Sequence, residues 1–351
     1  MPIDSTYPKS FASDNHAGVH PTILEAMAAA NHGDAPAYGG DRWTSTFEDH
    51  IKDVFGPGAE GFPVLNGAGA NMVGLAPMLG RYDAIICADT AHIATHETGA
   101  TERLLGAKLL TAPTADGKLR PQDITTRLDT LGSHHNSQPR VVSISQVTEL
   151  GTCYSPEELA ALADTAHAAG LLLHMDGARL ANAAAHLNTT LSAITTEVGV
   201  DIFSFGGTKN GALAAEAVIV LSSSSSLARA IPFLRRQSLQ LASKMRFVSA
   251  QLSALLTNDL WRHNATHANE MATRLANGIA DLPGITLAYP VQSNAVFATL
   301  PKPAAAALLT RYQFHYWDET AGTVRWMTAF DTTPNHVDDF LDDIHKSLVL
   351  P

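Results

Sequence analysis

Short apolar runs alternate with longer amphipathic stretches through most of this chain, and this pattern constrains its fold more than any other feature. Apolar runs of strand length cover residues 62–65, 84–88, 141–145, 171–175, 201–205 and 217–221. The clearest helical pattern between them covers residues 156–169, with Ser155 as N-cap, Glu158 as its capping-box partner and Gly170 as the stop. Strand–helix alternation predicts a mostly parallel sheet with helices on both faces, which binds ligands at the carboxyl ends of its strands.

The chain changes character near Trp261. Beyond it the pattern predicts helices over residues 264–280, 303–312 and 334–347 and short strands over residues 285–288, 295–300 and 323–327. We therefore expect a large α/β domain over residues 31–260 and a small α+β C-terminal domain over residues 261–351. Residues 1–30 are expected to pack on the small domain or to reach a neighbouring subunit.

Charge and cysteine content exclude several classes of protein. The net charge is −11 among 351 residues, without a run of Lys and Arg, which argues against nucleic acid or an anionic membrane as partner. Cys87 and Cys153 make no disulfide framework, and His92 and His96 lack a third ligand nearby, so no metal site is predicted. The start lacks a signal pattern and no apolar run could span a bilayer, so we expect a cytoplasmic protein.

Two segments place charged residues directly after predicted strands. In HMDGARL, Asp176 ends a buried strand, where a carboxylate needs a favourable partner. A structural pair with Arg179 is the alternative to a ligand-binding role. In SFGGTKNG, Lys209 follows a strand and two glycines, Gly206 and Gly207, which would let the backbone approach a ligand. A partly desolvated lysine is a usable amine nucleophile, whereas a surface turn is the alternative.

A third segment, LNGAGANMVG at residues 65–74, runs from a strand through a Gly-rich turn into a helix. The free N–H groups of such a turn favour a phosphate, although a simple tight turn is the alternative. In a parallel sheet the three segments meet at one edge. An anion site, a carboxylate and an amine are what pyridoxal phosphate requires for its phosphate, its pyridine nitrogen and its aldehyde. A nicotinamide cofactor would explain the turn but neither Lys209 nor Asp176.

The sequence resembles the threonine aldolase family of fold-type-I pyridoxal-phosphate enzymes, which have an aspartate-aminotransferase-like fold. The resemblance runs from FASDN near residue 11 to VRWMT near residue 324 and includes AYGGD, DGAR and the strand–lysine segment. It implies that Lys209 forms the Schiff base and that Asp176 pairs with the pyridine nitrogen. It further implies that Gly67 and Ala68 hold the phosphate through backbone N–H groups, and that His92 stacks on the cofactor ring near the substrate hydroxyl.

The resemblance also implies residues for the substrate. Ser13, Arg179 and Arg325 would hold its carboxylate, with Arg179 also near the cofactor. Arg246 would be a phosphate ligand donated by the adjacent subunit, Tyr38 would lie near the site across the interface, and His134 or His135 would be a second histidine near the substrate hydroxyl. These shared sites imply a homo-oligomer, either a dimer or a tetramer. Two departures are Asn66-Gly67-Ala68 in place of the usual Ser-Gly-Thr, and His96 in place of an aromatic residue.

The implied reaction is retro-aldol cleavage of L-threonine, L-allo-threonine or a related β-hydroxy-α-amino acid such as phenylserine, which gives glycine and an aldehyde. His92 would act as the base or orient it. Another pyridoxal-phosphate reaction, such as β-elimination or transamination, is the nearest alternative. A cofactor-binding regulator without catalysis is a further alternative; such proteins carry a DNA-binding module, whereas here the enzyme-like pattern starts by Phe11 and the net charge is acidic.

Overall fold

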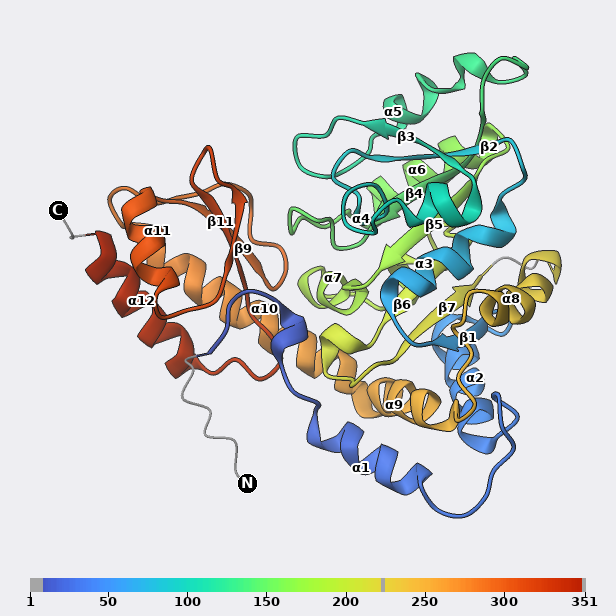
Figure 1. Cartoon of the computed structure of the whole chain (residues 1–351), viewed down its shortest axis with the longest axis horizontal. Coiled ribbons are helices and arrows are strands. Elements are labelled where there is room, and N and C mark those ends of the chain that lie inside the picture. Colours follow the sequence, from blue (N-terminus) through green and yellow to red (C-terminus); the bar gives the residue numbers. More distant parts are fainter. Residues whose placement is uncertain (1–8, 222–224, 349–351) are drawn as a thin grey trace.

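The computed structural model describes residues 9–221 and 225–348 (Figure 1). Its main sheet has seven strands in the order β1-β7-β6-β5-β4-β2-β3. Their bounds are β1 Glu60–Val64, β2 Asp83–Ala88, β3 Lys108–Ala112, β4 Gln138–Ser145, β5 Leu172–Gly177, β6 Ile202–Gly206 and β7 Glu216–Val220. The strands from β3 to β6 are parallel, and β7 runs antiparallel to β6 and β1. The predicted mostly parallel α/β sheet is therefore confirmed.

Helices cover both faces of this sheet, since every residue of β6 and β7 is buried. The α-helices of this part are α1 Pro21–Ala30, α2 Arg42–Phe55, α3 Gly67–Leu75, α4 His92–Thr95, α5 Pro121–Thr125, α6 Pro156–Ala168, α7 Leu180–His186, α8 Ser225–Gln237 and α9 Arg246–Leu256. The expected capping box starts α6: Glu158 N–H donates to Ser155 Oγ at 3.2 Å, and Ser155 N–H donates to the Glu158 carboxylate at 2.8 Å. It fixes the start of the helix that packs on β5.

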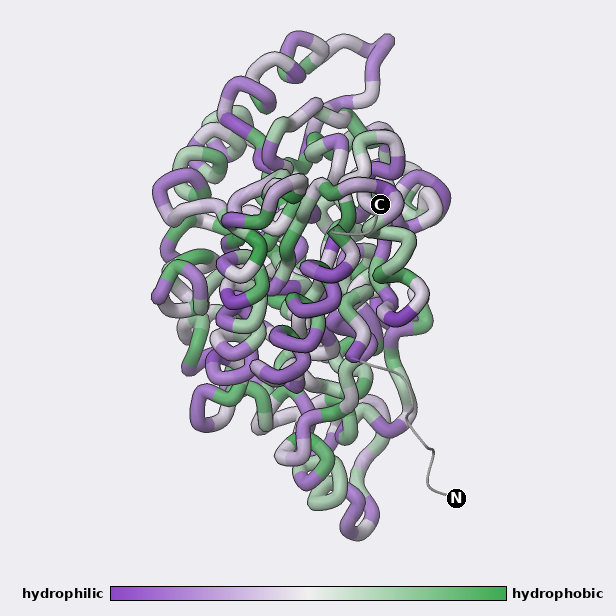
Figure 2. Tube along the Cα trace, turned by 90° about the vertical axis from the view of Figure 1, so that its left-hand side faces the viewer, coloured by the Kyte–Doolittle hydropathy of each residue, from purple (hydrophilic) through white to green (hydrophobic). Residues whose placement is uncertain are grey.

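The C-terminal part is a four-stranded antiparallel sheet in the order β10-β11-β9-β8, with helices packed against it. Its elements are α10 Leu260–Ile279, β8 Thr286–Leu287, β9 Ala295–Thr299, α11 Lys302–Leu309, β10 His315–Asp318, β11 Thr323–Met327 and α12 Pro334–Leu348. Helix α10 runs from α9 into this small domain (Figure 1). Hydrophobic and hydrophilic residues alternate along the helices nearest the viewer in Figure 2, as expected for helices with one face on a core.

Two strands that the sequence pattern did not predict lie at sheet edges. β3 pairs only with β2, and β10 pairs only with β11. Both are partly exposed and carry polar residues, so neither forms a continuous apolar run. Helix α10 also begins at Leu260, four residues before its predicted start at residue 264.

The N-terminal segment contacts both parts of the chain. Phe11 is fully buried in the small domain, where its ring stacks on Phe340 with 4.3 Å between centroids. Its N–H donates to Gln313 O at 2.9 Å, and its carbonyl accepts from Met327 N–H at 2.8 Å. The segment then crosses to the large domain, where α1 packs on α9. Residues between these two anchors pass the carboxyl edge of the main sheet.

Candidate active site

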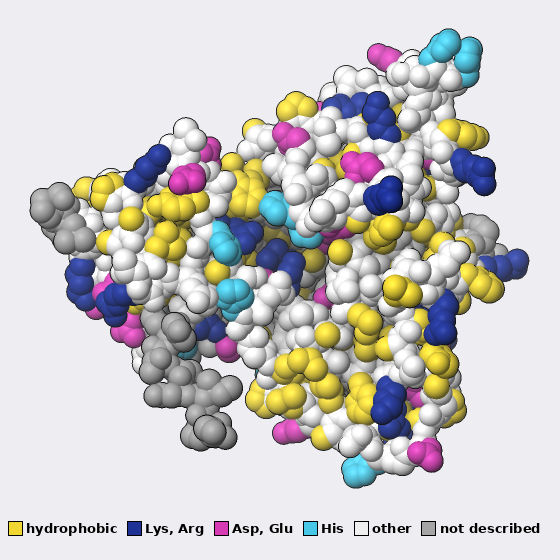
Figure 3. All heavy atoms as spheres, viewed as in Figure 1, with side chains coloured by type: hydrophobic (Ala, Val, Ile, Leu, Met, Phe, Trp, Pro, Cys, Tyr) yellow, Lys and Arg dark blue, Asp and Glu magenta, His cyan; other side chains and the backbone are white. Residues whose placement is uncertain are grey.

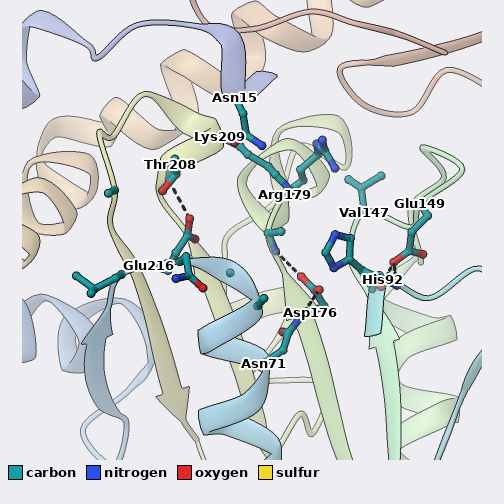
Figure 4. A pocket seen from close by; sticks show the side chains of 17 residues that line it. Asn15, Asn71, His92, Val147, Glu149, Asp176, Arg179, Thr208, Lys209 and Glu216 are labelled. Atoms are coloured by element: carbon teal, nitrogen blue, oxygen red, sulfur yellow. Dashed lines mark hydrogen bonds between the residues drawn. The ribbon is translucent and has the colours of Figure 1, made fainter. Parts of the chain in front are cut away.

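A pocket of about 370 Å³ lies at the carboxyl edge of the main sheet (Figure 4). It opens into the hollow between the two domains, where basic and histidine side chains gather (Figure 3). Six residues that the sequence predicts for the site line it: Gly67, Ala68, His92, Asp176, Arg179 and Lys209. Residues far apart in the chain meet here because parallel strands end at the same edge.

The Gly-rich turn presents the N-terminus of α3 to the pocket. Asn66 caps this helix, because its Oδ1 accepts from Gly69 N–H at 2.8 Å. A Cβ added at Gly67 would meet nothing within 4 Å, so the helix start faces open space. At Gly69 a Cβ would lie 2.2 Å from Gln240. Gly67 therefore leaves room for an anion at free N–H groups, whereas Gly69 is required by packing.

Asp176 lies next to the last residue of β5 and is buried. Its Oδ2 accepts from Asn71 Nδ2 at 2.8 Å, and its Oδ1 accepts from Ala178 N–H at 3.0 Å. Burial would raise the pKa of Asp176, but the hydrogen bonds from Asn71 and Ala178, together with the charge of Lys209, hold that pKa below its usual value. Asp176 therefore stays ionised without the ion pair to Arg179 that the sequence left open.

Lys209 follows β6 in a single 3-10 turn, Thr208–Asn210, and reaches into the pocket. Burial and the nearby Arg179 guanidinium lower the pKa of the Lys209 amine, which makes the neutral nucleophilic form more accessible. The glycines before it serve packing rather than a ligand. A Cβ at Gly206 would lie 2.3 Å from Ala178 O, and one at Gly207 would lie 2.4 Å from Ala215 O. The expectation that these two glycines admit a ligand is wrong, because other backbone fills that space.

Glu216 enters the pocket from the strand that runs in the opposite direction. It is the first residue of β7, and the start of an antiparallel strand lies at the same edge as the ends of its parallel neighbours. Its carboxylate accepts from Gly207 N–H at 3.1 Å and from Thr208 N–H at 3.4 Å. Burial raises the pKa of Glu216 to about 7. The sequence analysis missed this residue, although a carboxylate at the head of the run EAVIV is an unusual feature.

His92 is held by a network that extends to Asp176. Its Nδ1 pairs with Glu97 Oε1 at 2.9 Å, and Asn71 Nδ2 donates to both Glu97 Oε1, at 2.9 Å, and Asp176. The hydrogen bond with Glu97 raises the pKa of His92, and this effect exceeds the opposing effect of burial. Among the described residues, His92, Glu97 and Asp176 form a group with metal-ligand atoms within 4.8 Å of one another. Because the Asn71 amide already donates to both carboxylates, the arrangement suits hydrogen bonding better than a cation.

Arg179 is fixed by Asp14 rather than by Asp176. Its Nε and Nη2 donate to the two Asp14 oxygens at 2.7 and 2.9 Å. Asp14 also accepts from Asn294 Nδ2 at 3.0 Å. The neighbouring Ser13 caps the short turn Asp14–His16, where its Oγ accepts from Asn15 N–H. The N-terminal segment therefore positions the arginine that the sequence analysis selected for the substrate carboxylate.

Arg325 reaches the same region from β11 of the small domain. Its Nη2 donates to Ala12 O at 3.3 Å, while its buried Nε has no partner among the described residues. Burial lowers the pKa of Arg325, and repulsion by the Arg179 guanidinium lowers it further. A bound carboxylate would relieve this repulsion.

Aromatic rings extend from His92 toward the small domain. The His92 and His96 rings stack at 5.7 Å, and His96 stacks on Trp317 at 6.4 Å. Phe297 meets Trp317 edge-on at 5.3 Å. This row of flat rings begins at His92, which lines the pocket.

Glu149 lines the pocket from the loop that follows β4. Its Oε1 accepts from His92 N–H at 2.8 Å and from Ser145 Oγ at 2.6 Å. Burial raises its pKa, and the charge of Asp176 adds to this effect. The sequence analysis did not select Glu149, although it follows a predicted strand as Asp176 does.

Six predicted residues are not among those that line this pocket in the single chain: Ser13 and Arg325, described above, and Tyr38, His134, His135 and Arg246. His134 and His135 stand in an exposed loop before β4, and they therefore lie at the amino edge, opposite Asp176. They do not reach this pocket within the single chain, and their place near the substrate hydroxyl stays a prediction. Arg246 donates to Gly33 O at 2.9 Å, and Tyr38 lies against Arg236 at 5.1 Å. The role of Arg246 and Tyr38 across a subunit interface stays a prediction.

The residues present fit pyridoxal phosphate. The open N-terminus of α3 offers N–H groups for a phosphate, Asp176 offers an ionised carboxylate for a protonated ring nitrogen, and Lys209 offers an amine of lowered pKa for an aldehyde. All three face one pocket large enough for a small molecule.

Comparison with known proteins gives a consistent result. The family model for beta-eliminating lyases matches residues 10–302. A low specificity L-threonine aldolase of Pseudomonas sp. (strain NCIMB 10558) is 41% identical over 96% of this chain and 97% of its own length. The solved structure of Leishmania major threonine aldolase is 32% identical, covers 97% of this chain and 100% of that one, and has a TM-score of 0.92.

A more distant structure supports the fold alone. Aspartate aminotransferase from Thermus thermophilus is 16% identical and has a TM-score of 0.69, with 97% of this chain and 90% of that chain covered. It confirms the predicted aspartate-aminotransferase-like fold. From its sequence identity and its structural similarity, the chain belongs to the beta-eliminating lyase family and, within it, to the low specificity L-threonine aldolases.

Proposed function

We propose that this protein cleaves L-threonine, L-allo-threonine or a related β-hydroxy-α-amino acid, such as phenylserine, to glycine and an aldehyde. The observation that carries this proposal is the meeting of Lys209, Asp176 and the open start of α3 in one pocket. The family membership agrees with it. The enzyme is a pyridoxal-phosphate-dependent carbon–carbon lyase.

The substrate carboxylate binds between Arg179 and Arg325, with Ser13 beside them. Asp14 holds the Arg179 guanidinium in place, and the unpaired Nε of Arg325 is ready to donate to an anion. Fixing the carboxylate sets the orientation of the bonds at Cα and thereby selects the bond that breaks.

The remaining residues serve the cofactor and the hydroxyl group. Pyridoxal phosphate, bound through Lys209, supplies the electron sink that accepts the electron pair of the broken Cα–Cβ bond. Asp176 would keep a proton on the ring nitrogen, and Gly67 and Ala68 would donate N–H groups to the phosphate. His92 would stack on the ring and either accept the β-hydroxyl proton or orient the acceptor.

Incubation of the purified protein with L-threonine tests the reaction. We expect glycine and acetaldehyde in equal amounts. A keto acid would indicate transamination, and ammonia would indicate β-elimination; either result without acetaldehyde overturns the proposal.

The same assay tests His92. His92→Asn should lose most activity, because the imidazole lines the pocket and is held there by Glu97, which Asn71 connects to Asp176. Full activity of this variant would exclude the role of His92.

The protein also acts as a homo-oligomer, a dimer or a tetramer, with active sites shared between subunits. Large apolar side chains are exposed on the large domain, where Figure 3 shows a cluster of hydrophobic atoms. Leu213, Phe233 and Leu239 of the large domain are 55%, 75% and 83% exposed. Exposed apolar side chains of this size favour an interface. In this assembly Arg246 binds the cofactor phosphate of the adjacent subunit and Tyr38 lies near its site.

Mixing two inactive variants tests the shared site. Lys209→Ala and Arg246→Ala, unfolded and refolded together, should regain activity that neither has alone, because hybrid assemblies contain one intact site. If light scattering shows that the oligomer has re-formed and the mixture is still as inactive as its components, donation of Arg246 is excluded.

Over residues 9–221 and 225–348 no helix combines the length and apolarity needed to cross a membrane. We place the enzyme in the cytoplasm, in amino acid metabolism.

A further inference from the structure

One carboxylate oxygen of the pocket has no hydrogen-bond partner in the described part of the chain. Glu149 Oε1 accepts from His92 N–H and Ser145 Oγ, which fixes the side chain. Its Oε2 is buried and unpaired, and the residue lines the pocket. Buried polar atoms are nearly always hydrogen-bonded in native proteins. The partner of Oε2 is therefore expected to be a bound molecule with a donor group.

We propose that Glu149 is the catalytic residue that accepts the β-hydroxyl proton of the amino acid substrate, through Oε2. This inference rests on the proposed function, since it assigns a role in that reaction. The hydroxyl group is the donor that Oε2 lacks. Glu149 holds the backbone N–H of His92, so the carboxylate and the imidazole reach the pocket from the same place.

Glu149 is better suited to accept the proton than His92. The Nδ1 of His92 is engaged with Glu97, and this hydrogen bond raises the pKa of His92. His92 therefore has only Nε2 left for a further contact, whereas Glu149 Oε2 has no partner among the described residues. Burial raises the pKa of Glu149, which makes it a stronger base than an ordinary carboxylate. His92 then acts as the orienting group.

Protons and electrons balance in the proposed cleavage step. The O–H bond of the substrate breaks and a bond from the proton to Oε2 forms. The electron pair of the O–H bond becomes the second C–O bond of the aldehyde, and the pair of the Cα–Cβ bond would be accepted by the bound cofactor, which supplies the electron sink. The amine of Lys209, in its ammonium form, supplies the proton that makes glycine at Cα. Glu149 returns its proton to solvent, from which Lys209 is reprotonated.

This assignment separates two reactions of the same site. Exchange of the α-proton of glycine with solvent needs the cofactor, Lys209 and the carboxylate-binding arginines, but no hydroxyl group. Cleavage of threonine needs the hydroxyl acceptor in addition. A change confined to Glu149 should therefore impair cleavage and spare exchange.

The experiment uses Glu149→Gln in the holoenzyme. Gln keeps an oxygen acceptor for His92 N–H and Ser145 Oγ but has no basic oxygen. We expect kcat for threonine cleavage to fall about 100- to 1,000-fold. Glycine α-proton exchange in D₂O, followed by NMR, and the absorbance of the bound cofactor should stay close to the parental values. Glu197→Gln is the matched control, because Glu197 also accepts from a serine hydroxyl, Ser192 Oγ, at 2.9 Å on the surface.

Two results would overturn the assignment. One is parental cleavage by Glu149→Gln, and the other is an equal loss of cleavage and exchange, which would mean a structural role. If this variant does not bind the cofactor, Glu149→Asp replaces it, because Asp keeps the charge and withdraws it by one methylene. A fall in its ratio of cleavage to exchange supports the assignment, and an unchanged ratio overturns it. The proposed function fails separately, if the parental enzyme releases no aldehyde from any β-hydroxy-α-amino acid.

Discussion

Asp14 binds the guanidinium of Arg179 through both carboxylate oxygens, at 2.7 and 2.9 Å. Asp14 is buried and the Arg179 side chain is 18% exposed, and Asp14 also accepts from Asn294 of the small domain. Arg179 belongs to the large domain, so Asp14 connects the two domains at the point where the substrate carboxylate is expected. The geometry of the site thus depends on a residue near the start of the chain.

Asp14→Asn should lower the free energy of unfolding by about 2 kcal/mol, because the mostly buried Arg179 would lose its charged partner. Urea denaturation of the two proteins measures this difference. The matched control is Asp338→Asn, since Asp338 makes the same two-bond contact with Arg274, but with both side chains about half exposed. The control should unfold close to the parental urea concentration. Equal effects of the two substitutions would contradict the prediction.

Lys209→Ala should abolish covalent attachment of the cofactor. The parental protein is expected to be yellow and to be bleached by borohydride, which reduces a Schiff base. The variant lacks the amine, so borohydride treatment followed by mass spectrometry of the chain should find no added cofactor mass. Lys52→Ala removes an exposed lysine of α2 and should behave as the parent. Cofactor attached to the Lys209→Ala chain would exclude Lys209 as the attachment point.

His174 makes the fold sensitive to acid. It is fully buried two residues before Asp176 and pairs with Ser143 Oγ at 3.0 Å. Burial lowers its pKa from 6.5 to about 4, although the charge of Asp176 opposes the shift. Between these two values the unfolded chain binds a proton that the folded chain does not. This histidine therefore reduces stability as pH falls through that window, by at most about 1.4 kcal/mol per pH unit.

His174→Asn removes this contribution. Its free energy of unfolding, measured in urea at about pH 5 and about pH 7, should change less between the two conditions than that of the parent. The variant should be less stable than the parent at the higher pH, because it loses core packing. Equal changes with pH in the two proteins would show that His174 does not titrate as its burial implies.

Trp317→Ala should change substrate preference. The stacked row from His92 through His96 to Trp317 offers a flat surface to an aromatic β-substituent, whereas the methyl group of threonine is too small to use it. We expect kcat/KM for phenylserine to fall about fivefold relative to that for threonine. Tyr82→Ala, at an exposed ring before β2, should leave the ratio unchanged. A ratio that Trp317→Ala leaves unaltered would place the β-substituent elsewhere.

The sequence predicted the parts of the site that depend on parallel strands. Asp176 lies near the end of β5 and Lys209 follows β6, which is its parallel neighbour, so their meeting at one edge follows from the strand pattern. Glu216 was not predicted for the site, because it begins an antiparallel strand and strand direction cannot be read from an apolar run. Asp14 was not predicted either, since its partners Arg179 and Asn294 lie 165 and 280 residues away in the sequence.

Loops were the least predictable part. His134 and His135 were placed near the substrate by resemblance, but their loop precedes β4 and lies at the amino edge. Glu149 follows the same strand and reaches the pocket. The position of a side chain relative to the end of its strand was therefore a better guide than its residue type.

The anchoring of the N-terminal segment makes the site depend on contacts between residues far apart in the sequence. Phe11 and Asp14 contact Phe340, Met327 and Asn294, and the last of these contacts spans 280 residues. The main sheet is built from residues 60–220 alone, whereas the Asp14 contacts require the small domain as well. Folding of the main sheet can therefore precede completion of the carboxylate-binding part of the site.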